Sequence, residues 1–204
     1  MPQVLKDELR QRILAAALEV FAAHGFTGAT MTMIAERAGL GTASLYRYYP
    51  GKGELFAAVV TPELAARFEA LLERRVHALG RAVLGDAARD DGEELLRFWL
   101  EHRLAVVILL DRAAGTDYAH YGERFVELLV EATLGQLRAA QAGVRVSGPS
   151  RFVLARIFEG TRRTLAAILA EHADERALRE AIEAFWSYQI PGLAGFARWL
   201  GARR

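Results

Sequence analysis

The 204-residue chain contains no cysteine, which excludes disulfide bonds, thiolate metal ligands and cysteine nucleophiles. It also lacks an apolar run long enough to cross a membrane, since the longest, Leu104 to Leu110, lies between Arg103 and Asp111. The first residues, MPQVLKDELRQR, are charged where a secretion signal would be apolar. These absences predict a soluble protein in a reducing cytoplasm.

An excess of charge of one sign is also missing. Lys and Arg number 26 and Asp and Glu number 25, so the net charge is +1 and the chain has no overall basic field. A nucleic-acid-binding function would therefore need a local site.

The alternation of apolar and polar residues that marks a half-buried strand is absent too. Alanine, leucine, glutamate and arginine dominate, and β-branched residues are scattered. This pattern predicts an all-α fold.

Glycine, proline and capping residues divide the first sixty residues into short helices. Gly25 is the predicted left-handed residue after the first helix, and Thr30 is the predicted N-cap of the second. Thr61-Pro62-Glu63 has the N-cap, first-position proline and first-turn acid of a helix start or a kink. The helices predicted here are 4–24, 31–38, 42–49 and one that begins between residues 51 and 53.

Four longer helices are predicted in the remainder of the chain, over residues 93–113, 117–141, 149–172 and 174–200. Pro191 and Gly192 are predicted to break or kink the last of these helices and to leave LAGFARWL as a terminal turn.

Residues 30–49 form a predicted helix-turn-helix. Ile34, Ala38, Leu45 and Tyr49 are the predicted inward positions. Short residues at the start of the second helix would let its backbone enter the major groove, where hydroxyl and guanidinium groups reach bases or phosphates. No acid lies between Leu40 and Gly53. The outward face consists of Thr42, Ala43, Ser44, Tyr46, Arg47 and Tyr48.

Lys52 follows this face, beside the start of the next helix. There its ammonium would reinforce the positive helix dipole against a phosphate.

The segment TMTMIAERAGLGTASLYRYYPGKGEL resembles the DNA-binding signature of the TetR/AcrR transcriptional regulators, and ILAAALEVFAAHGFTGAT resembles that family's first helix. The resemblance covers about residues 9 to 60. The matching positions are Ile34-Ala35, Ala38-Gly39, Leu45-Tyr46, Tyr48-Tyr49, Lys52 and Leu55.

The resemblance implies contacts to double-stranded DNA from Thr30, Thr42, Ser44, Tyr46, Tyr48 and Lys52. Tyr46 and Lys52 would mainly contact phosphates, and Thr42, Ala43 and Tyr48 would lie nearest the bases. The alternative is that Tyr46 and Tyr48 only pack inside the fold. Gly41 stands where serine is common and Thr42 where lysine is frequent, so a weaker N-cap and a shallower salt dependence are expected.

The resemblance also implies two domains: a helix-turn-helix DNA-binding domain over residues 1–55, and a helical ligand-binding and dimerisation domain over 56–204. Apolar and polar groups combine in the candidate ligand residues Trp99, His102, Tyr118 and Tyr121. The alternative is that these four belong to an ordinary core. Helices 149–172 and 174–200 have wide apolar faces that would pair with a second copy, or pack only within the chain.

The predicted function is a homodimeric transcriptional repressor that binds a palindromic operator and is released by a small apolar or amphipathic ligand. An all-helical enzyme is the first alternative. The sequence has no His-x-x-x-His pair, Gly-x-Ser-x-Gly elbow or phosphate-binding loop, and no catalytic residue, metal site or cofactor is predicted. A protein-interaction module without sequence-specific DNA binding is the second alternative.

Overall fold

The computed structural model describes residues 3–83, 91–140 and 145–202, and all regular structure in these ranges is helical. The all-α prediction is confirmed. None of the helices in these ranges is both long and apolar enough to span a membrane. The elements are α1 (Gln3–Gly28), α2 (Met31–Arg37), α3 (Thr42–Tyr46), α4 (Lys52–Val59), α5 (Pro62–Val83), α6 (Asp91–Val107), the π-helix η1 (Ile108–Arg112), α7 (Tyr121–Ala140), α8 (Gly148–Glu171) and α9 (Glu175–Gly201).

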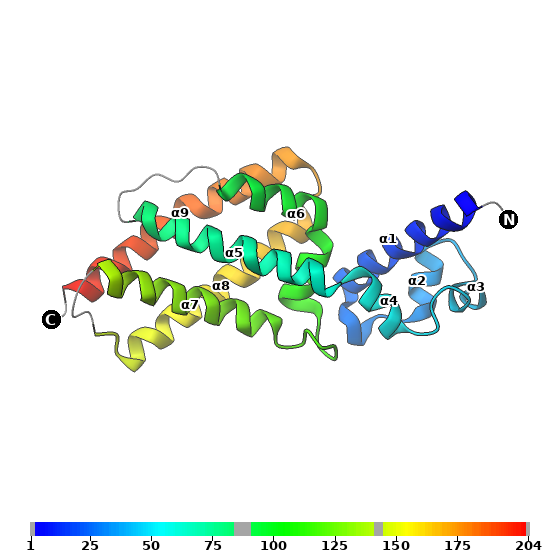
Figure 1. The fold of residues 1–204 in the computed structure, drawn as a ribbon, viewed down its shortest axis with the longest axis horizontal. Coiled ribbons are helices and arrows are strands. Elements are labelled where there is room, and N and C mark those ends of the chain that lie inside the picture. The colour runs from blue at the N-terminus through cyan, green and yellow to red at the C-terminus, as the bar shows by residue number, and fades with distance from the viewer. Residues whose placement is uncertain (1–2, 84–90, 141–144, 203–204) are drawn as a thin grey trace.

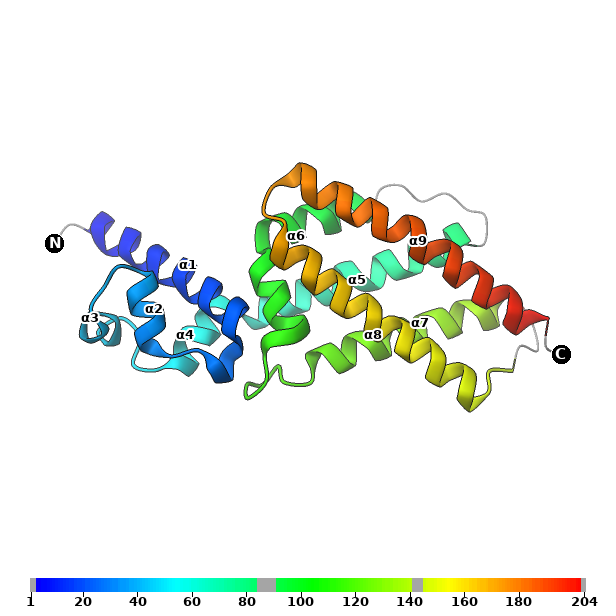
Figure 2. The ribbon, with the colours of Figure 1, turned by 180° about the vertical axis from the view of Figure 1, so that it is seen from behind.

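The molecule is elongated, with the N- and C-termini near opposite ends (Figure 1). Helices α1 to α4 form one end, and α5 leads from them into a larger bundle that contains α6 to α9. Seen from behind, α8 runs through the bundle and α9 lies beside α6 (Figure 2). In this bundle α8 packs against both α6 and α7, and α5 packs against the same two helices.

The first helix ends close to its predicted position, but one more helical turn follows. Gly25 has the positive φ expected of it, 69°, but its ψ of 166° is extended and not left-handed helical, and α1 then continues to Gly28. Phe21 on α1 is fully buried against Phe26 and Phe56. The end of α1 is thus anchored by aromatic packing across to α4.

The helix predicted over 93–113 has two irregularities. His102 has non-helical angles (φ −120°, ψ 21°), and the chain winds into η1 after Val107. Arg162 of α8 is 9% exposed and donates hydrogen bonds to the Leu110 carbonyl and to Asp111 Oδ1, the latter at 2.9 Å. Because η1 also packs on α1, it joins α8 to the N-terminal helices.

The predicted break near Pro191 is wrong. Helix α9 runs through Pro191 to Gly201, although proline has no N–H to donate to the preceding turn. The continued helix buries Leu200 and packs Phe196 against the core. This apolar burial offsets the lost hydrogen bond.

Candidate nucleic-acid interface

Two short helices and a tight turn form the predicted helix-turn-helix. The Thr30 hydroxyl accepts a hydrogen bond from the Met33 N–H at 3.2 Å, so Thr30 is the N-cap of α2 as predicted. Gly39 has φ 64°, which a residue with a side chain rarely adopts, and this allows the turn between α2 and α3. Helix α3 starts at Thr42 without a side-chain cap, since Gly41 has none to offer.

The inward side of this motif is as the sequence predicted. Ile34 and Leu45 are fully buried, Ala38 is 3% exposed and Tyr49 is 8% exposed. These side chains join the core formed with α1 and α4. The position of α3 is therefore fixed by the packing of these buried side chains.

The outward side of α3 presents short and polar groups. Tyr46 is 49% exposed, and Ala43 and Arg47 are also exposed. The Arg47 guanidinium donates to Ser44 Oγ at 3.1 Å, so the two lie together. The half-buried members of the face are Thr42, Ser44 and Tyr48, and Thr30 is exposed at the start of α2.

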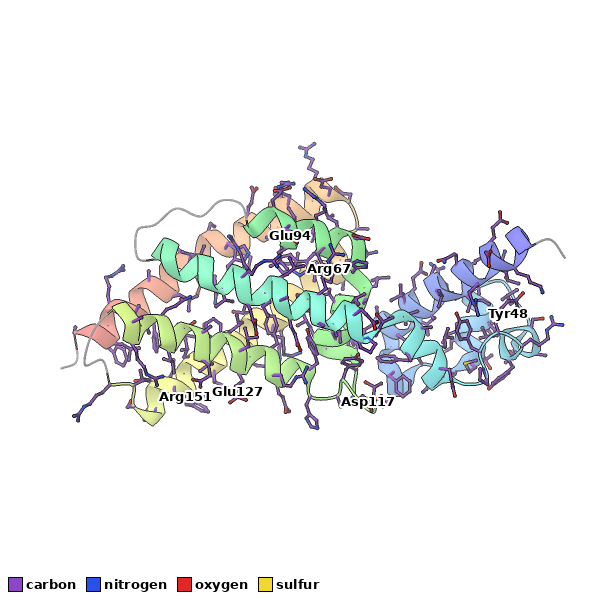
Figure 3. All side chains as sticks on the ribbon, in the orientation of Figure 1. Tyr48, Arg67, Glu94, Asp117, Glu127 and Arg151 are labelled. Atoms are coloured by element: carbon purple, nitrogen blue, oxygen red, sulfur yellow. The ribbon has the colours of Figure 1, made fainter. Side chains whose placement is uncertain are left out.

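Tyr48 has two roles at this end of the molecule. Its side chain is half-buried and packs against the core, yet part of it stays at the surface (Figure 3). The packing interpretation of the two outward tyrosines therefore applies in part to Tyr48. Tyr46, with about half its surface exposed, is presented to solvent.

Lys52 lies at the start of α4, but its ammonium group is directed inward. It donates hydrogen bonds to the Phe26 carbonyl at 2.7 Å and the Ala29 carbonyl at 2.9 Å. Nζ also stands 4.5 Å from the centroid of the Phe26 ring. The phosphate contact of Lys52 stays a prediction, and its protein contacts were not apparent from the sequence.

The four candidate ligand residues make different contacts within the described part of the chain. His102 packs on Phe98, with the ring centroids 4.8 Å apart. Tyr118 and Tyr121 have ring centroids 6.3 Å apart, and the Tyr121 hydroxyl donates to the Ala65 carbonyl at 3.4 Å. Burial raises the pKa of Tyr121 above its usual value, so its phenol stays protonated. His102, Tyr118 and Tyr121 thus have partners within the fold, and their role in ligand binding stays a prediction.

Trp99 borders a cavity that has a volume of about 580 Å³ and lies between α6, α9 and α5. Trp99 is 3% exposed, and its indole N–H has no hydrogen-bond partner in the described part of the chain. Arg179 at the edge makes two hydrogen bonds to Glu93, at 3.0 and 2.9 Å. The apolar wall includes Leu95, Leu96, Ile182, Trp186 and Ile190.

Sequence reasoning missed this cavity because the side chains that complete it come from α9. Their apolar pattern indicated packing, and nothing in it identified α6 as the neighbour.

Sequence reasoning also missed the ion pair between Glu159 and Arg162 on α8. The available signal was their spacing, because oppositely charged residues three positions apart lie on the same side of a helix.

Helix α2 has a side-chain cap, and the short helix α3 that follows it has a buried inner side and a polar outer side. This arrangement defines a helix-turn-helix DNA-binding domain. Residues 13–59 match the family described as bacterial regulatory proteins, tetR family. This match extends from within α1 to the end of α4 and includes the whole helix-turn-helix.

Curated relatives are similar over part of their length. The transcriptional repressor AcnR of Corynebacterium diphtheriae is 31% identical over 113 residues, which are 54% of this chain and 56% of AcnR. The transcriptional regulator SrpR of Pseudomonas putida is 46% identical over 54 residues, or 26% of this chain and 25% of SrpR. The chain spans about half, or less, of the length of these relatives.

Solved structures resemble the whole chain loosely. A tetR-family transcriptional regulator from Streptomyces coelicolor is 18% identical, with a TM-score of 0.42, over 96% of this chain and 89% of that one. NalD, the secondary repressor of an efflux pump in Pseudomonas aeruginosa, is 19% identical, with a TM-score of 0.39, over 91% and 97%.

Proposed function

We propose that the protein is a transcriptional repressor that binds double-stranded DNA in a sequence-specific manner through α3. The outward face of α3, on a domain that matches the tetR family over residues 13–59, is the observation that carries this proposal. A regulator of this kind acts where the DNA is, which places it in the cytoplasm. The proposed division is a DNA-binding domain over 1–55 and a ligand-binding and dimerisation domain over 56–204.

The chemistry of the face fits DNA without a strongly basic domain. Thr42 and Ala43 are small enough for the start of α3 to approach base edges, and the half-buried Tyr48, after the end of α3, is the third proposed base contact. The Tyr46 hydroxyl and the Arg47 guanidinium are placed to donate to phosphates, with Ser44 oriented by Arg47. Thr30, at the N-cap of α2, is the proposed backbone contact on the neighbouring element.

Binding should be measured by fluorescence anisotropy with a duplex from the region upstream of the protein's own gene. We expect saturable binding. A scrambled duplex of equal length and composition, added at equal concentration, should not displace the first duplex. Equal affinity for both duplexes would remove the support for a sequence-specific regulator at that site and favour an interaction module.

We propose that two copies pair through residues 149–200. Phe152 on α8 is 64% exposed and Tyr188 on α9 is 80% exposed, and apolar surface of this kind commonly marks protein interfaces. A dimer would present two α3 helices to a palindromic operator, since one helix reads only a few base pairs. Light scattering should give the mass of a dimer for the native chain and of a monomer for Tyr188→Glu. A monomeric native chain would contradict the pairing.

We propose that the Trp99 cavity holds the small molecule that releases the DNA. A volume of about 580 Å³ suits such a ligand, and a wall that combines apolar side chains with Arg179 and Ser187 suits an apolar or amphipathic molecule. Release would follow if the ligand binds better to a conformation that fits the operator poorly.

N-phenyl-1-naphthylamine, an apolar dye, provides a test of this cavity. Its fluorescence should increase with the native protein and not with Ile190→Trp, which fills the cavity from its half-buried edge. Ala184→Trp, at an exposed position of the same helix outside the cavity, is the control and should bind the dye normally. Equal dye binding by all three proteins would place the dye elsewhere.

A further inference from the structure

Lys52 connects the ends of three helices. It is the first residue of α4, and its ammonium donates to the carbonyls of Phe26, in the last turn of α1, and of Ala29, directly before the N-cap of α2. Carbonyls at the end of a helix have no partner within it and carry the negative end of the dipole. The cation thus satisfies two such groups and fixes the start of α4 against the junction of α1 and α2.

Aromatic packing strengthens this attachment. Nζ lies 4.5 Å from the Phe26 ring centroid, within the range of a cation–π interaction. The same ring meets Phe56, one turn further along α4, edge to face at 5.2 Å. Helix α4 therefore holds Phe26 from two sides, through Lys52 and through Phe56.

The start of α4 is also a poor place for a phosphate. The Glu54 carboxylate lies over it, because a Cβ added to Gly51 would stand 2.8 Å from Glu54 Oε2. A phosphate there would meet this negative charge. Two of the three ammonium N–H groups of Lys52 are already directed into the protein.

We propose that Lys52 is a positioning residue that sets the orientation of α3, and that it does not contact phosphate. Only residues 47–51 separate α3 from α4, and Tyr49 among them is buried. A fixed start of α4 therefore restricts where α3 can lie. The inference rests on the proposed DNA-binding function only for its effect on affinity, since the contacts exist within the protein itself.

Amine labelling of the native protein tests the contacts without any substitution. The chain has two lysines, Lys6 and Lys52, and Lys6 is exposed. Brief reaction with an acetylating reagent, followed by peptide mass spectrometry, should modify Lys52 about tenfold or more slowly than Lys6, because two charged hydrogen bonds hold its nitrogen. The rate at Lys52 should not change when DNA is added. Equal rates for the two lysines in the free protein, or strong protection of Lys52 by DNA, would overturn the proposal.

Substitution separates positioning from phosphate contact. Without DNA, Lys52→Met should lower Tm by about 4 °C, because it leaves the two carbonyls unpaired. With DNA, affinity should fall, but the slope of log affinity against log salt should stay as in the native protein. Arg47→Met, which removes one exposed cation of the α3 face, is the control and should reduce that slope by about 0.9 while Tm stays unchanged.

A slope for Lys52→Met that falls as far as that for Arg47→Met would overturn the proposal, whatever happens to Tm. An unchanged Tm would overturn it as well. Failure of the native chain to bind DNA would count against the proposed function alone, because the labelling and the melting temperature are measured without DNA. Lys52→Arg, which keeps the charge but not the ammonium geometry, should lower Tm less than Lys52→Met.

Discussion

The two ends of the molecule differ in how their helices are fixed. Helices α2 and α3 are short and are delimited by local signals, such as the Thr30 cap and the positive φ of Gly39. Helices α5 to α9 are long and depend on partners distant in sequence, such as Arg162 with Asp111. Substitutions on the α3 face should therefore change DNA affinity and leave folding intact. Substitutions inside the bundle should lower stability and leave the DNA affinity of the folded protein near native.

The largest effect is expected at Phe68, at the centre of the bundle. Its ring is fully buried and stacks with Phe98, Tyr121 and Phe125 at centroid distances of 5.8 to 6.3 Å. Phe68→Ala should lower the free energy of unfolding by about 4 kcal/mol through lost burial and a cavity. Urea denaturation at fixed protein concentration measures this. Phe68→Leu should cost much less, and the DNA affinity of the folded fraction should stay near native in both variants.

The second effect concerns pH and the ion pairs of α8. Hydrogen bonds from Arg162 and Arg163 lower the pKa of Glu159 to about 2, from 4.5 in the unfolded chain. A carboxyl whose pKa is lowered on folding stabilises the protein above pH 4.5, and this stabilisation is lost as the pH falls towards 2. The stability advantage of the native protein over Glu159→Gln should thus shrink by up to about 3 kcal/mol across that interval. An advantage that is constant with pH would contradict the ion pairing.

Two glycines of α7 give a matched pair with opposite outcomes. A Cβ on Gly122 would lie 2.6 Å from the Leu110 carbonyl oxygen and 3.1 Å from Arg162 Cδ, so the backbone would have to shift. Gly122→Ala should lower the free energy of unfolding by about 2 kcal/mol. A Cβ on Gly135 would meet nothing within 4 Å, and Gly135→Ala should raise stability by about 0.5–1 kcal/mol. Similar melting temperatures for the two variants would contradict the close packing of α7 on η1.

The last effect is expected on the α3 face and concerns DNA affinity, not stability. Tyr46→Phe removes only a hydroxyl from a half-exposed ring and should raise Kd for the operator about tenfold, with Tm unchanged. Tyr49→Phe is the control at a buried position and should leave Kd near the native value. Equal losses of affinity in the two variants would show that Tyr46 acts through folding alone.

The sequence predicted the N-terminal end in more detail than the bundle. Leu45 and Tyr49 could be placed inside and Tyr46 outside because a two-helix motif has one inner side. The contacts of Lys52 within the protein could not be predicted, because the carbonyls that it reaches belong to residues 23 and 26 positions earlier. A sequence pattern gives the periodicity of a helix but not the backbone groups that approach its ends.

In the bundle, the helices were predictable and their neighbours were not. Trp99, His102, Tyr118 and Tyr121 have the composition of a ligand site, yet the kink at His102 and the segment before α7 distribute them over different contacts. Pro191 indicated a break, but the burial of Leu200 and the packing of Phe196 keep α9 continuous. Both outcomes depend on tertiary packing.

Selection of bound sites from a library of random duplexes tests the central claim most directly. The native protein should enrich one two-fold symmetric sequence, and Tyr46→Ala combined with Arg47→Ala should lose that enrichment while Tm stays native. Failure of the native protein to enrich any sequence, or equal enrichment by the double variant, would contradict DNA recognition through α3.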